Sequence, residues 1–129
     1  MSFDWSKYFV LAEVLIKAQG KERLAEEYRR SAISRGYYFV FHLTKAKVES
    51  DGFRVPIESA HSFLINTLDS EYGEDGITYA EWLKSFRKER THADYFPVPE
   101  FLSQDKVSAL LFQMRRVTSN ELNKLVRMS

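Results

Sequence analysis

The sequence predicts an all-α fold, an up-and-down helical bundle of about five helices that forms one domain over residues 1–129. Apolar residues recur at spacings of three and four along most of the chain, which is the periodicity of amphipathic helices. The five Gly and three Pro residues fall mostly where such helices should end. An apolar content of 44% is enough for a packed core, and no convincing strand pattern competes with this interpretation.

The first two predicted helices are separated by Gly20 and cover residues 6–19 and 21–49. The second is long and has one apolar face, made of Leu24, Tyr28, Ala32, Gly36, Phe39 and Leu43. Gly36 costs roughly 1 kcal/mol relative to Ala inside a helix. Close approach by another helix would explain why a glycine is tolerated there.

The remaining helices are predicted from proline, serine and capping signals. They cover residues 57–69, residues 78 to just before Pro97, and Ser103 to Arg127. Pro56 suits the entry to the first of them, and Thr78-x-x-Glu81 is a capping-box pattern that should begin the second. Between them, residues 71–77 are predicted to form an acidic loop, and residues 53–55 a short extended piece.

Composition excludes several classes of function. With no cysteine, the chain has no disulfide, no thiolate metal site and no Cys nucleophile. No basic leader with an apolar run and no stretch of 18 apolar residues is present, so we expect a cytoplasmic protein with no membrane contact. The net charge of +1 is too low for a general nucleic-acid coat, so any RNA must meet local basic clusters such as residues 84–90.

Three segments carry a family resemblance, and they occur in the family's order over about residues 24–95. The first is Arg30-Ser31-Ala32-Ile33-Ser34-Arg35-Gly36-Tyr37-Tyr38-Phe39-Val40-Phe41-His42, where Gly36 replaces a usual Ala and Phe39-Val40 replaces two small residues. The second is Ser59-Ala60-His61-Ser62-Phe63-Leu64, and the third is Arg90-x-x-Ala93-Asp94-Tyr95. These segments resemble the signature helix, the His-containing third helix and the Arg-x-x-Ala-Asp-Tyr ending of HEPN domains.

The resemblance implies a helical bundle, a homodimer and a bacterial or archaeal setting. HEPN domains often pair with a minimal nucleotidyltransferase in toxin–antitoxin or phage-defence modules. Active members cleave RNA without a metal, through an Arg-x4-6-His motif to which both chains of the dimer contribute. The resemblance therefore implies RNA as the substrate and a nucleotidyltransferase antitoxin as the partner, with no cofactor.

Arg87 and His92 satisfy this motif by spacing, and their chemistry fits cleavage of RNA. A histidine exchanges protons near neutral pH, and an arginine stays charged and can bridge two phosphate oxygens. The family ending, however, aligns its arginine with Arg90, and five residues further stands Tyr95, a poor base with a reference pKa of about 10. The predicted catalytic residues are therefore Arg87 or Arg90 with His92.

Helix geometry offers a structural alternative to this catalytic interpretation. Residues five apart point about 140° apart on a helix, so Arg87 and His92 converge only if the helix unwinds or two chains supply them. Arg90 and Asp94, four apart, can instead form an ion pair that fixes the helix end.

Further binding residues are predicted at His61, Arg35, Asp94 and Tyr95. The three histidines are not at metal-ligand spacing, so no metal site is expected. The aromatic run Tyr37-Tyr38-Phe39 with Phe41 allows two interpretations, a base-stacking platform or core packing with a dimer seam.

The sequence thus leads to one main hypothesis and one alternative. The first is a HEPN domain protein of a toxin–antitoxin or phage-defence module that acts as a metal-independent endoribonuclease. The alternative is a non-catalytic interaction or nucleotide-binding module that partners a minimal nucleotidyltransferase.

Overall fold

The computed structural model describes residues 6–17, 22–95 and 103–128, and these residues form helices without any strand. The elements are α1 (Ser6–Lys17), α2 (Glu22–Ser50), α3 (Ala60–Glu71), α4 (Gly73–Tyr95), α5 (Gln104–Asn120) and the 3₁₀-helix η2 (Leu122–Lys124). The predicted all-α helical bundle is confirmed. None of the described helices is both long and apolar enough to cross a membrane.

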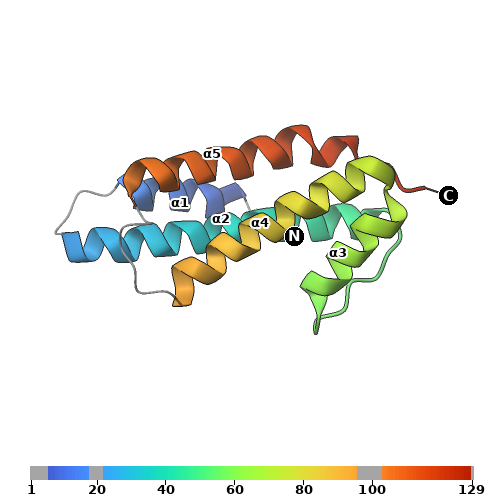
Figure 1. Ribbon diagram of the computed structural model, residues 1–129, viewed down its shortest axis with the longest axis horizontal. Helices are drawn as coiled ribbons and strands as arrows, with labels where there is room; N and C mark the ends of the chain where they lie inside the picture. Colours follow the sequence, from blue (N-terminus) through green and yellow to red (C-terminus); the bar gives the residue numbers. More distant parts are fainter. Residues whose placement is uncertain (1–5, 18–21, 96–102, 129) are drawn as a thin grey trace.

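The long helix α2 is the central element, and α1, α3, α4 and α5 all contact it. Figure 1 shows α5 running alongside α2, with α4 crossing α2 at an angle on its way back from the α3–α4 turn. Helix α3 packs mainly against α4, with which it forms a hairpin near the end of α2. This arrangement places the first turn of α3 opposite the middle of α2 and α4.

A buried polar pair joins α2 to α4 inside the apolar core. The hydroxyl of Thr44 donates to the carbonyl oxygen of Val40 at 2.7 Å, and Oγ1 of Thr44 also lies 2.7 Å from the hydroxyl oxygen of Tyr79. Since Thr44 has only one proton to give, Tyr79 is the donor to Thr44. Both residues are fully buried, and this pairing removes the cost of burying two unsatisfied hydroxyls.

The boundary between α3 and α4 differs from the prediction. Helix α3 begins at Ala60 rather than at residue 57, after Ser59 in a left-handed conformation with φ of 61°. The acidic loop at residues 71–77 and the capping box at Thr78 were wrong predictions, because α4 already begins at Gly73. Gly73, with φ of 65°, allows the tight turn, and Glu74 and Asp75 then lie in the first turn of α4, where the helix dipole favours carboxylates.

The last helix is shorter than predicted. Ser103 caps α5 as expected, its hydroxyl accepting from the backbone N–H of Lys106 at 3.3 Å, but α5 ends at Asn120 rather than Arg127. The chain then turns through η2, which allows both Leu122 and Leu125 to be buried. The predicted extended piece at residues 53–55 forms no strand, although Val55 is buried.

Gly36 meets the expectation of a close helix approach. A Cβ there would lie 2.7 Å from both Leu111 Cδ2 and Met114 Sδ, two side-chain ends on α5. Gly76 is more constrained, because its Cβ would overlap the backbone carbonyl oxygen of Leu68 and lie 2.5 Å from Tyr72 Cβ. Backbone atoms shift less easily than the end of a side chain, so Gly76 should tolerate substitution by alanine less well than Gly36.

We expect Gly76→Ala to lower the free energy of unfolding by about 2 kcal/mol, since overpacking typically costs about 1–3 kcal/mol. Gly36→Ala should change it by less, because Leu111 and Met114 can shift and helix propensity improves by about 1 kcal/mol. Urea denaturation followed by circular dichroism measures both. A Gly76→Ala protein as stable as the unsubstituted protein would contradict the close α3–α4 approach.

Candidate functional site

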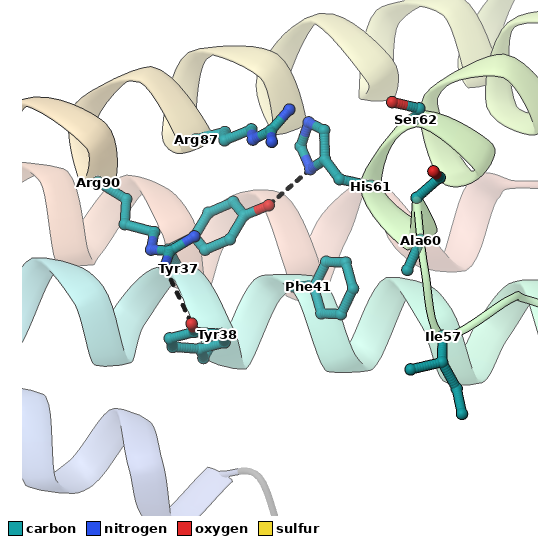
Figure 2. A pocket seen from close by; sticks show the side chains of 10 residues that line it. Tyr37, Tyr38, Phe41, Ile57, Ala60, His61, Ser62, Arg87 and Arg90 are labelled. Carbon is teal, nitrogen blue, oxygen red and sulfur yellow. Dashed lines mark hydrogen bonds between the residues drawn. The ribbon is translucent and has the colours of Figure 1, made fainter.

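A cavity of about 270 Å³ lies where α2, α4 and the first turn of α3 meet. Its walls carry basic, aromatic and hydroxyl groups from three segments, as Figure 2 shows. The lining residues are Tyr37, Tyr38 and Phe41 of α2, Ile57, Ser59, Ala60, His61 and Ser62 around the start of α3, and Arg87 and Arg90 of α4.

A short hydrogen bond ties α3 to α2 at this cavity. The Tyr37 hydroxyl and Nδ1 of His61 are 2.6 Å apart, and the tyrosine is almost completely buried. Burial raises the pKa of Tyr37 to about 12 despite the nearby Arg87 and Arg90 charges, so the hydroxyl keeps its proton at neutral pH. The Tyr37 hydroxyl is therefore an uncharged partner at neutral pH, and its bond to Nδ1 restrains the orientation of the His61 ring.

Arg90 is held by several contacts at once. Its Nη2 donates to the Tyr38 hydroxyl at 3.0 Å, and its guanidinium carbon lies 5.5 Å and 4.9 Å from the ring centres of Tyr37 and Tyr38. Its Nε lies 3.2 Å from Asp94 Oδ2 but makes no hydrogen bond, so this contact is an ion pair only. Arg90 is consequently a positioned cation whose charge Asp94 partly offsets.

Arg87 lies one turn before Arg90 on the same face of α4, and its side chain is exposed. Among the described residues no carboxylate forms an ion pair with its guanidinium. Figure 2 shows this guanidinium pointing toward the His61 ring, across the cavity from Phe41. Its charge is thus available to an anion entering the cavity.

The charge state of His61 follows from this environment. Burial, and then the positive charges of Arg87 and Arg90, lower the pKa of His61 from 6.5 to about 4. The ring is therefore neutral at pH 7, and either of two tautomers satisfies the bond to Tyr37. If Tyr37 donates to Nδ1, Nε2 carries the proton; if Nδ1 donates to Tyr37, Nε2 presents a lone pair.

The start of α3 adds backbone groups to the same cavity. Ser59 adopts its left-handed conformation immediately before the helix, and its side chain makes no capping hydrogen bond. Such a conformation is uncommon for a residue other than glycine. Ser59, Ala60, His61 and Ser62 all line the cavity, so the first turn of α3, the positive end of its dipole, lies beside it.

Of the residues predicted from the sequence, the structure brings Arg87, Arg90 and His61 together in one cavity. The anticipated Arg90–Asp94 ion pair is present at 3.2 Å. His92 is exposed on α4 and is not among the lining residues, and α4 stays helical through this segment. The catalytic role predicted for His92 therefore stays a prediction.

Two further predicted binding residues lie elsewhere. Arg35 is half-buried on α2, where its Nε donates to the Ser31 hydroxyl at 3.3 Å, and it does not line the cavity. Tyr95 is the last residue of α4, and its side chain lies outside the described part of the structure. Arg30 of α2 donates from Nη1 to the carbonyl oxygen of Ala93 at 2.6 Å and so ties α2 to the end of α4.

The partnership of Tyr37 with His61 is not predicted by the sequence. The two residues are 24 positions apart, and helix periodicity indicates only that Tyr37 faces inward. The spacing of three between Arg87 and Arg90 did contain a usable signal, since such residues share a helix face.

Comparison of the chain with protein families, with curated proteins and with solved structures finds no significant match. Within the described residues, no group of three or more His, Asp or Glu side chains could hold a metal ion. Identification of the site therefore depends on its own geometry.

The depressed pKa of His61 predicts a loss of stability in mild acid. In the unfolded chain the histidine gains a proton near pH 6.5, whereas in the folded protein it does so only near pH 4. Stability should therefore fall as the pH falls through this window, by roughly 1 to 2 kcal/mol after allowance for solvent screening. Thermal unfolding of the unsubstituted protein and of His61→Gln at pH 7 and pH 4.5 measures it.

The unsubstituted protein should lose more stability between these pH values than His61→Gln does. His42, whose burial also lowers its pKa, contributes equally in both proteins and cancels. Parallel losses in the two proteins would contradict a neutral, half-buried His61.

Proposed function

We propose that this chain is a HEPN-type domain of a toxin–antitoxin or phage-defence module that binds RNA and cleaves it without a metal. The observation that carries the proposal is the gathering of Arg87, Arg90, His61 and Tyr37 around one cavity. Tyr37, His61 and Arg90 come one each from the three segments that resemble the HEPN family, and Arg87 lies one turn before the third segment. Two guanidinium groups and a helix N-terminus favour a phosphate of the RNA backbone as the ligand.

Cleavage would require an acid or base beside the bound phosphate. His61 lies in the same cavity as Arg87, and the Tyr37 hydroxyl orients its ring. In the tautomer whose Nε2 has a lone pair, His61 can take the proton of a ribose 2′-hydroxyl while Arg87 stabilises charge on the phosphate. The 2′-oxygen then bonds to phosphorus, the bond from phosphorus to the 5′-oxygen breaks, and that oxygen leaves with a proton from solvent water. We therefore assign the base to His61, with His92 of a second chain as the competing candidate.

The second candidate function is a binding module without catalysis that partners a nucleotidyltransferase. Burial and the two arginines hold the pKa of His61 near 4, which makes its protonated form rare at neutral pH and the neutral ring a weak base. Arg90 is also occupied by Tyr38 and Asp94. The weak basicity of His61 limits cleavage but not the binding of a phosphate by Arg87, and it therefore favours the binding module.

An RNA cleavage assay in EDTA distinguishes the two candidates. We expect Arg87→Ala to slow cleavage of a labelled single-stranded RNA by about 10²-fold, as loss of one preorganised donor does. His61→Ala should slow it by at least about 10²-fold, because the base is lost. Lys106→Ala, an exposed residue on α5, is the control and should cleave normally.

Each other outcome has a definite meaning. Loss of cleavage in His92→Ala but not in His61→Ala would transfer the acid/base role to His92. RNA binding that depends on Arg87, with no cleavage by the unsubstituted protein, would establish the binding module. If the unsubstituted protein neither bound nor cleaved RNA, the proposal as a whole would be overturned.

We also propose a homodimer, and exposed apolar side chains on two neighbouring helices support it. Val10 and Val14 are exposed one turn apart on α1, and Phe112 is 68% exposed on α5. Arg115, one turn after Phe112, forms an ion pair with Glu13 at 3.3 Å, so these residues lie on adjoining surfaces. Apolar surfaces of this kind fit a protein–protein interface.

Sedimentation equilibrium at micromolar concentration should therefore show a dimer. Phe112→Lys should weaken dimerisation at least about tenfold, because a buried aromatic anchor is replaced by a charge. Ile77→Lys, at an exposed apolar position on α4, is the matched control and should leave the dimer intact. A monomer under these conditions would contradict the proposed homodimer.

A further inference from the structure

The cavity between α2, α3 and α4 has two chemically different sides. Arg87 and His61 supply the polar side, with the backbone of the first turn of α3 beside them. Phe41 and Ile57 supply an apolar side, and Figure 2 shows the Phe41 ring below His61, with Ile57 lower still. A phosphate would use only the first side.

Ile57 stands out among the apolar residues of the chain because it is 98% exposed. It lies in the link between α2 and α3, where it adds nothing to the core. A single exposed apolar residue needs no explanation by itself. Here, however, the side chain stands at the rim of a cavity whose floor includes the half-buried ring of Phe41.

The combination limits the class of ligand. An anionic group is favoured beside Arg87, with which no carboxylate of the described residues forms an ion pair. A flat apolar group fits beside Phe41 and Ile57, because aromatic side chains stack on nucleobases of any sequence. A volume of about 270 Å³ is at the low end for a ligand cavity, which suits one nucleotide better than several.

We propose that the cavity binds a single nucleotide unit, with its phosphate between Arg87 and His61 and its base against Phe41 and Ile57. This inference rests on the proposed function where the nucleotide belongs to RNA. The same chemistry would also accept a free mononucleotide. Ile57 is then a specificity-determining residue that distinguishes a nucleotide from a bare phosphate or a sugar phosphate.

Nuclear magnetic resonance titration of the ¹⁵N-labelled full chain tests the proposal with matched probes. The probes are inorganic phosphate, ribose 5-phosphate, adenosine 5′-monophosphate and an eight-nucleotide single-stranded RNA. Adenosine 5′-monophosphate should bind about tenfold tighter than ribose 5-phosphate, since stacking of one base on a protein ring has an effect of this order. Arg87→Ala should weaken binding of all four probes.

Ile57→Ser isolates the base subsite, because so exposed a residue can be replaced without disturbing the core. It should remove most of the preference for adenosine 5′-monophosphate over ribose 5-phosphate and leave the binding of ribose 5-phosphate unchanged. Ile77→Ser, exposed on α4 and outside the cavity lining, is the control and should alter neither.

The outcomes separate this inference from the proposed function. Equal affinity for the two small probes, together with RNA binding that Ile57→Ser does not change, would overturn the base subsite and leave phosphate binding intact. A tenfold loss of affinity in Ile57→Ser that is confined to the RNA probe would support the base subsite and identify RNA as the source of the nucleotide. Binding of no probe, or binding unaffected by Arg87→Ala, would overturn both proposals.

Discussion

The hydrogen bond between the Tyr37 hydroxyl and Nδ1 of His61 is the contact on which the geometry of the cavity depends. Helix α3 packs mainly on α4 and makes few contacts with the central helix α2, and this bond is one that positions its first turn against α2. A buried tyrosine hydroxyl needs a partner, and a half-buried imidazole meets that need without a second charge. With the ring held by this bond, Nε2 has a defined direction relative to Arg87, and both roles of His61, donor to a phosphate and base toward a 2′-hydroxyl, use that direction.

The electrostatics of the cavity follow from a difference in the contacts of its two arginines. Asp94 and the hydroxyl of Tyr38 hold Arg90, whereas Arg87 has no ion pair among the described residues. The cavity therefore combines one fixed cation, one available cation and a neutral histidine. A cation entering the cavity would be repelled, and an uncharged ligand would leave Arg87 unused, so an anion is the ligand that the charges favour.

Much of this arrangement could be predicted from the sequence, and the exceptions have identifiable causes. Periodicity located the long helix α2, and the expected close approach at Gly36 is present because α5 brings Leu111 and Met114 against it. The start of α4 was misplaced because the capping-box pattern is local, whereas the turn at Gly73 depends on how closely α3 and α4 pack. In the site, Arg87, Arg90 and His61 were named individually. The contact of His61 with Tyr37 could not be predicted, because the periodicity of apolar residues within one helix does not indicate which residue of another helix it meets.

The two tautomers of His61 explain why one geometry supports both binding and cleavage. A phosphate oxygen placed at Nε2 would favour the tautomer that donates there, which strengthens binding but removes the lone pair that a base needs. Cleavage therefore requires the phosphate to be held by Arg87 and not by Nε2, so that Nε2 stays free for the 2′-hydroxyl. A nucleobase stacked on Phe41 and Ile57 would influence whether binding or cleavage occurs, because it would set the distance between the ribose and the imidazole. The apolar side of the cavity would then affect not only which ligand binds but also whether its bond is in position to be broken.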